Sequence, residues 1–508
     1  MREFDTVIIG AGPGGYVAAI SASRAGQSVA VIENRRVGGT CLNRGCIPAK
    51  AMIHASTLYR EALDGARFGV HAPDATYNYE EIVQYKEDTI DKLVGGVEQL
   101  LKAGGVTLIQ GTGTLELPQD GKNIVSVSAP EGEKELLSAD HVILATGSKP
   151  AALPIPGADL PGVLNSDGLF ALRQAPESLV IIGGGVIGVE FATAFANLGT
   201  KVTIVEALPK LLDNFDREIS QNLKMILKKK GVDAHLNARV MEFVEGEEGV
   251  ICRFSEKDKE QTVSGQYVLV AAGRRPVTEG LFGEGIRLVQ EDEAEADSAT
   301  ESAVILMKGR FVQVDACQRT SMPGVYAIGD ITGGMQLAHA ASAQGIRAVE
   351  AIQKGCSDPA VCDCDPADSC CDPSSFSQDI PVIPGGVYTD PEIASVGMTE
   401  AEAKEAGREV LCGKFIMSAN GKSLITGDER GFIKVVADAS TDEILGAQMM
   451  CSRATDMIGE FTTAIVNHMT VADMLRSVRP HPTYNEGIAE ALEAVHGTSL
   501  HTVPQRRR

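Results

Sequence analysis

A short apolar run, a glycine-rich stretch and a second apolar run follow one another near the start of the chain. The first run covers residues 5–9, the glycines lie within residues 10–15, and the second run covers residues 27–32 and ends at Glu33. Continuous apolar runs of this length are typical of strands buried on both faces. The pattern predicts a strand, a tight turn, a helix and a second strand that ends at an acidic residue.

The same order returns far downstream. Apolar runs at residues 178–182 and 201–205 flank the glycines of residues 183–188, and the second run ends at Glu206. In both copies the acid follows the last motif glycine by 18 residues. This repeat indicates two related units of strand, helix and strand.

Each copy has the chemistry of a dinucleotide site. The glycines of a GxGxxG turn allow a tight bend, a close approach of the backbone to a pyrophosphate, and packing of the helix on the strand. The helix N-terminus offers free N–H groups to phosphate, and the acid accepts hydrogen bonds from ribose hydroxyls. We therefore expect two bound dinucleotides. The residues concerned are Gly10, Gly12, Gly14, Gly15 and Glu33 in the first copy, and Gly183, Gly185, Val186, Ile187, Gly188 and Glu206 in the second.

Glu206 also indicates which nucleotide the second copy binds. A carboxylate at this position accepts a hydrogen bond from a free 2′-hydroxyl and repels a 2′-phosphate. The residues that follow, Ala207, Leu208 and Pro209, include no arginine that could bind such a phosphate. The sequence thus favours NAD over NADP.

Three more apolar runs extend the pattern, at residues 141–147, 267–273 and 325–330. Their placement predicts that the first nucleotide domain is interrupted by the second and returns after it. From about residue 380 alternating strands precede a helical stretch at 454–469, which predicts a further α+β domain. We expect an α/β protein with two nested Rossmann-like domains and this third domain.

Composition narrows the class of protein. The chain has 508 residues, a formal net charge of -22 and 11 cysteines. The charge argues against nucleic acid as a partner, because that surface needs clustered lysine and arginine. The sequence shows no apolar window of roughly 20 residues for a membrane span and no secretory signal. An odd cysteine number without an export signal favours a reducing compartment, and we expect a cytoplasmic location.

Cys41 and Cys46 lie five positions apart, after a pair of glycines. Two cysteines at this spacing can close a small disulfide ring at the start of a helix. The helix N-terminus lowers the pKa of a thiol and stabilises a thiolate. Because a nucleotide motif comes directly before them, the sequence predicts a redox-active pair.

The segment 38–50, GGTCLNRGCIPAK, resembles the redox-active segment of the pyridine nucleotide-disulfide oxidoreductase family. The similarity extends over nearly the whole chain, through motifs at residues 145–148, 273–276, 320–330, 337–339, 388–392 and 481–486. Within the family it is greatest to members that act on dihydrolipoamide. The resemblance implies FAD in the first site, NAD in the second, and a C-terminal dimerisation domain.

The resemblance also implies roles for single residues. Cys41 would exchange with the dithiol substrate, Cys46 would lie against the flavin, and Lys50 and Glu190 would pair near it. For FAD the remaining implied residues are Gly39, Thr40, Gly113, Thr146, Gly147, Gly329, Asp330, Leu337, Ala338 and His339, and for NAD they are Val240 and Gly273.

His481 and Glu486 suit the proton transfer that thiol–disulfide exchange requires. Histidine has the appropriate pKa range for a base, and a carboxylate five residues on can orient its ring. In the family this pair reaches the disulfide of the other subunit, which implies a homodimer with a shared active site. The implied reaction oxidises protein-bound dihydrolipoamide to lipoamide and reduces NAD⁺. The implied partner is a lipoyl-bearing protein of a 2-oxoacid dehydrogenase or glycine cleavage complex.

We expect these domain limits: FAD-binding domain 1–148, NAD-binding domain 149–273, return of the FAD-binding domain 274–355 with an acidic insertion 290–302, Cys-rich insertion 356–379, and dimerisation domain 380–508. The five thiols of the Cys-rich insertion suit a soft metal, but their spacing matches no zinc pattern, and we assign no metal. Two alternatives remain open. One is a mercuric-type or low-molecular-weight disulfide reductase, and the other is a structural subunit or thiol-rich metal-binding protein.

The chain departs from the family pattern near these motifs. Asp390 stands where the family commonly has histidine, and Arg479-Pro480 stands where His-Ala often precedes the catalytic histidine. Arg44, Ala49 and Ala340 also differ from the usual residues. None of these changes removes a reacting group.

Overall fold

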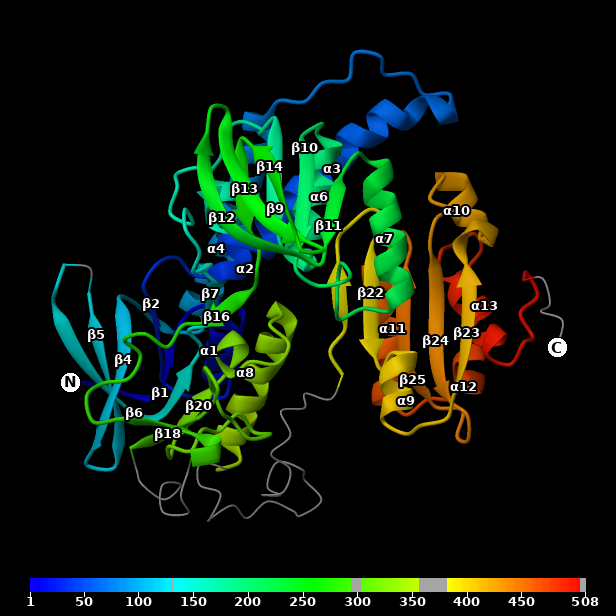
Figure 1. Ribbon diagram of the computed structural model, residues 1–508. Coiled ribbons are helices and arrows are strands. Elements are labelled where there is room, and N and C mark those ends of the chain that lie inside the picture. Colours follow the sequence, from blue (N-terminus) through cyan, green and yellow to red (C-terminus); the bar gives the residue numbers. More distant parts are fainter. Residues whose placement is uncertain (130, 294–302, 356–381, 503–508) are drawn as a thin grey trace. The chain divides into compact units, whose positions relative to one another are not determined.

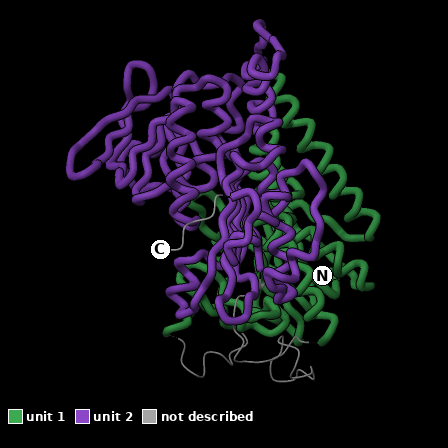
Figure 2. The backbone as a smooth tube through the Cα atoms, turned by 90° about the vertical axis from the view of Figure 1, so that its right-hand side faces the viewer, with its two compact units in different colours: residues 1–51, 81–151, 273–380 green, residues 52–80, 152–272, 381–508 purple. Residues whose placement is uncertain are grey.

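The computed structural model of the protein describes residues 1–129, 131–293, 303–355 and 382–502 (Figure 1). The chain divides into two compact units (Figure 2). The first comprises residues 1–51, 81–151 and 273–380, and the second comprises residues 52–80, 152–272 and 381–508. Each unit thus combines segments that are distant in sequence. The Cys-rich insertion and residues 294–302 of the acidic insertion lie outside the described residues.

The first unit is built on a seven-stranded sheet with the order β3-β2-β1-β6-β5-β4, in which β20 also pairs with β6. Strands β1, β2, β3, β6 and β20 run parallel, and β4 and β5 add antiparallel pairs. The bounds are β1 (Arg2–Ile9), β2 (Val29–Glu33), β3 (Thr107–Gln110), β4 (Thr112–Gln119), β5 (Lys122–Ser128), β6 (Lys134–Leu144) and β20 (Val325–Ala327). The return of the chain as β20 extends the sheet that β1 began.

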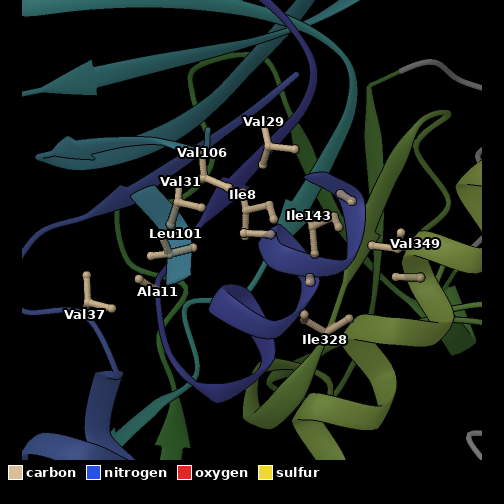
Figure 3. Packing of buried hydrophobic residues seen from close by; sticks show 14 of the residues in the cluster. Ile8, Ala11, Val29, Val31, Val37, Leu101, Val106, Ile143, Ile328 and Val349 are labelled. Atoms are coloured by element: carbon tan, nitrogen blue, oxygen red, sulfur yellow. The ribbon is translucent and has the colours of Figure 1, made fainter. Parts of the chain in front are cut away.

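Both faces of this sheet are buried, which explains the continuous apolar runs. Successive side chains of a strand point to opposite faces, so Ile8, Val31 and Ile143 share one face while Val7 and Ile9 lie on the other. Figure 3 shows the first group packed with Leu101, Val106, Ile328 and Val349. Full burial of one such side chain contributes about 2 kcal/mol.

Helices α1 (Pro13–Arg24), α4 (Tyr79–Ala103) and α8 (Ala338–Gln353) contribute to this core. In α4 the buried residues Val83, Ile90, Val94, Val97 and Leu101 recur at helical spacing, so one face is apolar and the rest is polar. In the part of the chain that the structure describes, we find no helix both long and apolar enough to cross a membrane.

The second unit contains a five-stranded parallel sheet with the order β11-β10-β9-β15-β8. Its bounds are β8 (Val163–Leu164), β9 (Ser178–Ile182), β10 (Lys201–Glu206), β11 (Asp233–Leu236) and β15 (Tyr267–Val270). Helices α6 (Val186–Asn197) and α7 (Arg217–Lys229) connect its strands, and an antiparallel sheet of β12 (Ala238–Gly246), β13 (Gly249–Glu256) and β14 (Lys259–Gly265) follows. The glycine-rich turn 183–188 joins β9 to α6, as β1 is joined to α1.

The C-terminal part of the second unit is an antiparallel sheet with the order β21-β22-β25-β24-β23. Its bounds are β21 (Gly385–Val387), β22 (Ile393–Gly397), β23 (Val410–Ile416), β24 (Phe432–Asp438) and β25 (Ile444–Met450). The helices of this part are α9 (Glu400–Glu405), α10 (Gly421–Thr426), α11 (Ala454–Val466), α12 (Val471–Leu475) and α13 (Glu486–Val495). Helices α11 and α13 pack on the sheet in one apolar cluster.

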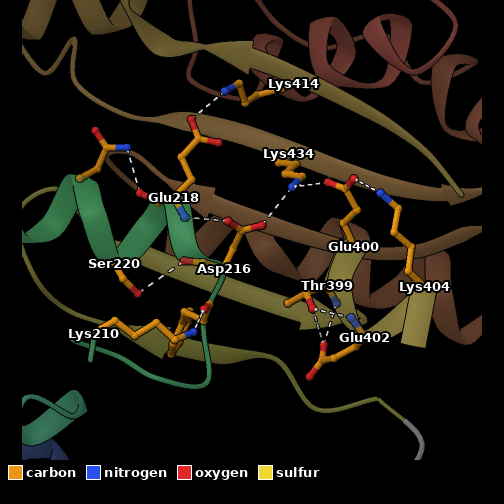
Figure 4. A network of polar contacts seen from close by, with 12 residues as sticks. Lys210, Asp216, Glu218, Ser220, Thr399, Glu400, Glu402, Lys404, Lys414 and Lys434 are labelled. Carbon is orange, nitrogen blue, oxygen red and sulfur yellow. Dashed lines mark hydrogen bonds and ion pairs between the residues drawn. The ribbon is translucent and has the colours of Figure 1, made fainter. Parts of the chain in front are cut away.

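A charged network joins this sheet to α7 within the second unit (Figure 4). The Asp216 carboxylate caps α7 by accepting the Glu218 N–H at 2.8 Å, and its other oxygen lies 3.0 Å from Nζ of Lys434 on β24. The same Nζ lies 2.8 Å from Glu400, at the start of α9, and Glu400 also binds Lys404 at 2.6 Å. The Lys434 side chain is only 13% exposed, so its charge is matched by two carboxylates rather than by water.

Candidate functional site

The two glycine-rich turns have the same backbone geometry. Gly10 has φ +106° and Gly183 has φ +109°, values that L side chains rarely adopt. A Cβ on Gly15 would lie 1.9 Å from the Gly10 carbonyl oxygen, and one on Gly188 would lie 2.0 Å from that of Gly183. The third glycine of each motif is therefore required for the helix to pack against the turn.

Each turn leads directly into a helix whose first-turn N–H groups receive no side-chain cap from the described residues. Gly12 is the N-cap of α1 and Gly185 is the N-cap of α6, and neither helix has an acid in its first turn or a capping side chain from the described residues. A Cβ built on Gly185 meets nothing within 4 Å, and one on Gly12 meets only Gly39 Cα at 4.0 Å. The first-turn N–H groups and the space above them fit a pyrophosphate.

Glu33 at the end of β2 and Glu206 at the end of β10 form the same pattern of hydrogen bonds in the two copies. Oε2 of Glu33 accepts the Ala11 N–H at 2.9 Å, and Oε2 of Glu206 accepts the Gly184 N–H at 2.5 Å. The other oxygen of each acid accepts the N–H two residues further on, from Arg35 at 2.9 Å and Leu208 at 2.7 Å. Each carboxylate is thus fixed beside its glycine turn. These donor sets fit a dinucleotide in each copy.

Asp330 is fixed by two residues for which the sequence alone predicts no role. Its carboxylate accepts a short hydrogen bond from the Ser148 hydroxyl, and Nε of Arg274 lies 2.7 Å from that hydroxyl and 3.8 Å from Asp330. Nη2 of Arg274 also donates to the Ser148 carbonyl at 2.8 Å. Both residues lie in the motifs at 145–148 and 273–276, so the motifs themselves were the available signal.

The remaining predicted nucleotide-site residues lie on several elements. For FAD, Gly39 and Thr40 begin α2 (Gly39–Arg44), Gly113 lies on β4, Gly147 has φ +67°, and the Thr146 hydroxyl donates to the Val277 carbonyl at 2.7 Å. Gly329 starts the short helix that contains Asp330, Leu337 is the N-cap of α8, and Ala338 and His339 form its first turn. For NAD, Val186 and Ile187 begin α6, Val240 lies on β12, and Gly273 precedes β16 (Arg274–Pro276).

The predicted redox cysteines lie on consecutive helices. Cys41 is in α2, and Cys46 is the first residue of α3 (Cys46–Asp64). Gly39 brings α2 against the first glycine turn, because it has φ +56° and a Cβ there would lie 2.7 Å from Gly12 Cα. The structure therefore brings the cysteine segment and the first nucleotide motif together.

The two thiols are in direct contact. A hydrogen bond to Cys46 raises the pKa of Cys41 above that of an ordinary thiol, and burial raises it further. The Lys50 ammonium has the opposite, smaller effect on the pKa of Cys41. The two thiols are therefore close enough for each to influence the ionisation of the other.

His481 and Glu486 form the expected pair at the start of α13. Nδ1 of His481 lies 2.8 Å from Oε1 of Glu486, and Oε2 accepts the Thr483 N–H at 2.8 Å. Burial would raise the pKa of Glu486, but these two hydrogen bonds outweigh it, and the pKa lies below that of an ordinary glutamate. The His481 side chain is 78% exposed. Its ring is therefore accessible from solvent.

The predicted residues fall into both units. The cysteines, Lys50 and Asp330 belong to the first unit, whereas Glu190, Glu206, His481 and Glu486 belong to the second. The pairing of Lys50 with Glu190 therefore stays a prediction. The part of the chain that the structure describes holds no cluster of three or more metal-binding side chains.

Two family models match the chain. The model described as pyridine nucleotide-disulphide oxidoreductase matches residues 4–345, and the corresponding dimerisation domain matches residues 383–492. Curated relatives named dihydrolipoyl dehydrogenase include one from Bacillus subtilis, 38% identical over 98% of this chain and 99% of its own length. Another, from Halobacterium salinarum, is 36% identical over 98% of each chain.

Solved structures are similar over the same extent. LpdA from Mycobacterium tuberculosis aligns with a TM-score of 0.81 and 26% identity, over 97% of this chain and 99% of that one. The Cu(II) complex of the HOCl-induced flavoprotein disulfide reductase RclA from Escherichia coli aligns with a TM-score of 0.77 and 28% identity. The alignment with RclA also covers 97% of this chain and 99% of that one.

Proposed function

Because the chain belongs to the pyridine nucleotide-disulphide oxidoreductase family, we propose that it oxidises protein-bound dihydrolipoamide to lipoamide with Cys41 and Cys46 as its redox pair. It is an FAD-dependent disulfide oxidoreductase that uses NAD, as its relatives named dihydrolipoyl dehydrogenase indicate. The same relatives do not favour a mercuric-type reductase or a purely structural subunit.

One observation carries the proposal: the Cys41 and Cys46 thiols contact each other beside the first glycine turn. In the oxidised enzyme a substrate thiolate would attack the Cys41 sulfur, the Cys41–Cys46 bond would break, and Cys46 would leave as a thiolate. The position of Cys46 at the N-terminus of α3 supports this order, because the helix dipole stabilises a leaving thiolate there. The second substrate thiol would then displace Cys41.

His481 would take the proton from the attacking dithiol. The Glu486 carboxylate holds Nδ1 of its ring, which leaves Nε2 to accept the proton. The exposure of His481 supports a site completed by a second subunit. The C-terminal part is a dimerisation domain, and a homodimer follows from it. Sharing of the active site between subunits is part of the proposal.

FAD would be held by the turn 10–15, Glu33 and Asp330, and NAD by the turn 183–188 and Glu206. The preceding geometry supports both, because each turn combines a bare helix N-terminus with a fixed carboxylate. When bound, the two cofactors supply a path for two electrons from the thiol pair to nicotinamide. We further propose a lipoyl-bearing protein of a 2-oxoacid dehydrogenase or glycine cleavage complex as partner, and a cytoplasmic location.

Steady-state assays test the proposal. We expect the purified flavoprotein to reduce NAD⁺ with dihydrolipoamide, and to do so much faster than it reduces NADP⁺. Background rates with dihydrolipoamide, together with high rates of NADPH-dependent reduction of glutathione disulfide or Hg²⁺, would overturn the assignment.

Cysteine variants provide the matching control. Cys41→Ser and Cys46→Ser should each abolish dihydrolipoamide oxidation while flavin content stays that of the wild type. Cys412→Ser, which removes a half-buried thiol of β23, should retain full activity. Activity in either of the first two variants would show that the pair is not the redox centre.

A further inference from the structure

Asp390, the residue that replaces the family's usual histidine, has a specific partner. Its Oδ2 lies 2.7 Å from Nζ of Lys230, the residue that caps the C-terminus of α7. The Lys230 side chain is 18% exposed, whereas that of Asp390 is 43% exposed. The contact is therefore a partly sheltered, charge-assisted hydrogen bond.

Lys230 also binds α6. Its Nζ donates to Oδ1 of Asn197 at 3.0 Å. Asn197 is the last residue of α6 and is buried. The Lys230 ammonium thus connects the C-terminal ends of α6 and α7 to the segment between β21 and β22.

Glu190 lies on the same helix, two turns before Asn197. It is buried, and its Oε1 accepts the Tyr388 N–H at 3.0 Å. Tyr388 comes two residues before Asp390. These contacts form a closed ring. Helix α6 links Glu190 to Asn197, and hydrogen bonds link Asn197 to Lys230 and Lys230 to Asp390. The backbone then links Asp390 to Tyr388, whose N–H returns to Glu190.

The other end of this segment is anchored independently of Lys230. Oε2 of Glu392 accepts the Thr455 N–H at 3.0 Å and the Thr455 hydroxyl at 2.6 Å, and the Glu392 carbonyl accepts the Cys451 N–H at 3.0 Å. Within this ring, the Lys230 side chain holds Asp390 while the Glu190 side chain holds the Tyr388 N–H. Loss of the Lys230 ammonium would leave Asp390 and the Asn197 oxygen without that partner, and the turn could shift.

We propose that Lys230 is a positioning residue for Glu190: through Asp390 it fixes the Tyr388 N–H that holds the Glu190 carboxylate. The inference rests on the proposed function for its catalytic consequence, because Glu190 is one of the residues predicted to lie beside the flavin. A displaced carboxylate would mainly slow hydride transfer between the nicotinamide and the flavin. Thiol–disulfide exchange at Cys41 would be much less affected.

The first test measures the geometry and does not depend on activity. In the holoenzyme, Lys230→Met should raise the hydrogen-exchange rate of the Tyr388 amide by about tenfold, and Lys230→Arg should restore most of the protection. Asp390→Ala, which removes the acceptor oxygens, should have the same effect as Lys230→Met. Unchanged exchange at Tyr388 in Lys230→Met would overturn the inference, whatever substrate the enzyme uses.

The second test measures the consequence by anaerobic stopped-flow reduction of the bound flavin with NADH. Lys230→Met and Asp390→Ala should each slow reduction by about tenfold, and the double variant should be no slower than either. Lys414→Met, which breaks a 2.7 Å ion pair with Glu218 elsewhere in the second unit, is the matched control and should match the wild type.

The two ways of failing are distinct. A wild-type protein that lacks flavin, or that reacts with neither NADH nor dihydrolipoamide, would contradict the proposed function. The exchange rate of the Tyr388 amide would still test whether Lys230 positions this segment. A fully active wild type with an equally fast Lys230→Met contradicts the positioning role alone. Deficits that multiply in the double variant would also contradict it, since they would mean that Lys230 and Asp390 act separately.

Discussion

Nδ1 of His481 lies 2.8 Å from Oε1 of Glu486, and both carboxylate oxygens of Glu486 are engaged, since the second accepts the Thr483 N–H. This contact fixes which ring nitrogen faces the acid and leaves the other for proton transfer. The segment that carries this pair is also held from outside, because Nδ2 of Asn420 donates to the Thr483 carbonyl at 3.0 Å.

We expect His481→Gln to lower the rate of dihydrolipoamide oxidation by roughly 100- to 10,000-fold, the usual contribution of a general base. Flavin content and thermal stability should be unchanged, because the side chain is exposed. The measurement is steady-state NAD⁺ reduction with dihydrolipoamide. His496→Gln, in which the lost partner is Asp442 at 2.9 Å, serves as the control. A variant at position 481 with wild-type rates would refute the base role.

Glu206→Gln should reduce the preference for NAD⁺ over NADP⁺ by about tenfold in kcat/KM, because it removes the charge that repels a 2′-phosphate. The amide can accept from only one of the Gly184 and Leu208 N–H groups, which bind different carboxylate oxygens, so the variant loses one of these two hydrogen bonds. Glu245→Gln, at an exposed position of β12, should leave the ratio unchanged. An unaltered ratio in Glu206→Gln would mean that this acid does not select the nucleotide.

Arg479 should position the His481 segment. Its side chain is only 6% exposed, it forms an ion pair with Glu460 of α11, and Nη1 donates to the Ser477 carbonyl at 3.1 Å. We expect Arg479→Leu to lower kcat for dihydrolipoamide oxidation by about tenfold with little change in KM, and Arg479→Lys to recover part of the loss. Arg453→Leu, which loses an exposed pair with Asp456, should behave as the wild type. Equal kcat values for Arg479→Leu and the wild type would exclude this role.

The network around Lys434 predicts a pH dependence of stability. Hydrogen bonds from Lys404 and Lys434 lower the pKa of Glu400 to about 2. Because the folded pKa lies below that of glutamate in the unfolded chain, about 4.3, this stabilisation is present above that pH and is lost as the pH falls toward 2. Glu400→Gln should therefore lower Tm by about 2 °C at pH 7, and the difference should shrink below pH 4. Thermal scans of both proteins at pH 7, 4 and 2.5 test this. A difference that persists unchanged at pH 2.5 would contradict it.

Much of the fold could be predicted because its signals are local. The glycines of the two turns are required by positive φ values and close backbone contacts, and both requirements act within a few residues. The predicted architecture of two nucleotide-binding folds and a C-terminal α+β part is confirmed. The helix expected at 454–469 ends at Val466, because boundaries depend on capping more than on periodicity.

The partners of the site residues were harder to predict, because they come from distant segments. The Ser148 hydroxyl contacts Arg274 and Asp330, although more than a hundred residues separate it from either. The contact between Lys230 and Asp390 likewise joins distant parts of the sequence. A single sequence contains no distance information across such gaps. The motifs indicated which residues matter but not which of them touch.

The discontinuous first unit also has a consequence for synthesis on the ribosome. Strand β20 pairs Val325 with Val142 of β6, in the sheet that begins with β1. At about 5–20 residues per second, the nascent chain must wait many seconds between the emergence of β6 and that of its last neighbour. During this interval residues 142–144 of β6 have unpaired N–H and C=O groups along one edge. We therefore expect newly synthesised chains to bind chaperones that cover unpaired strands.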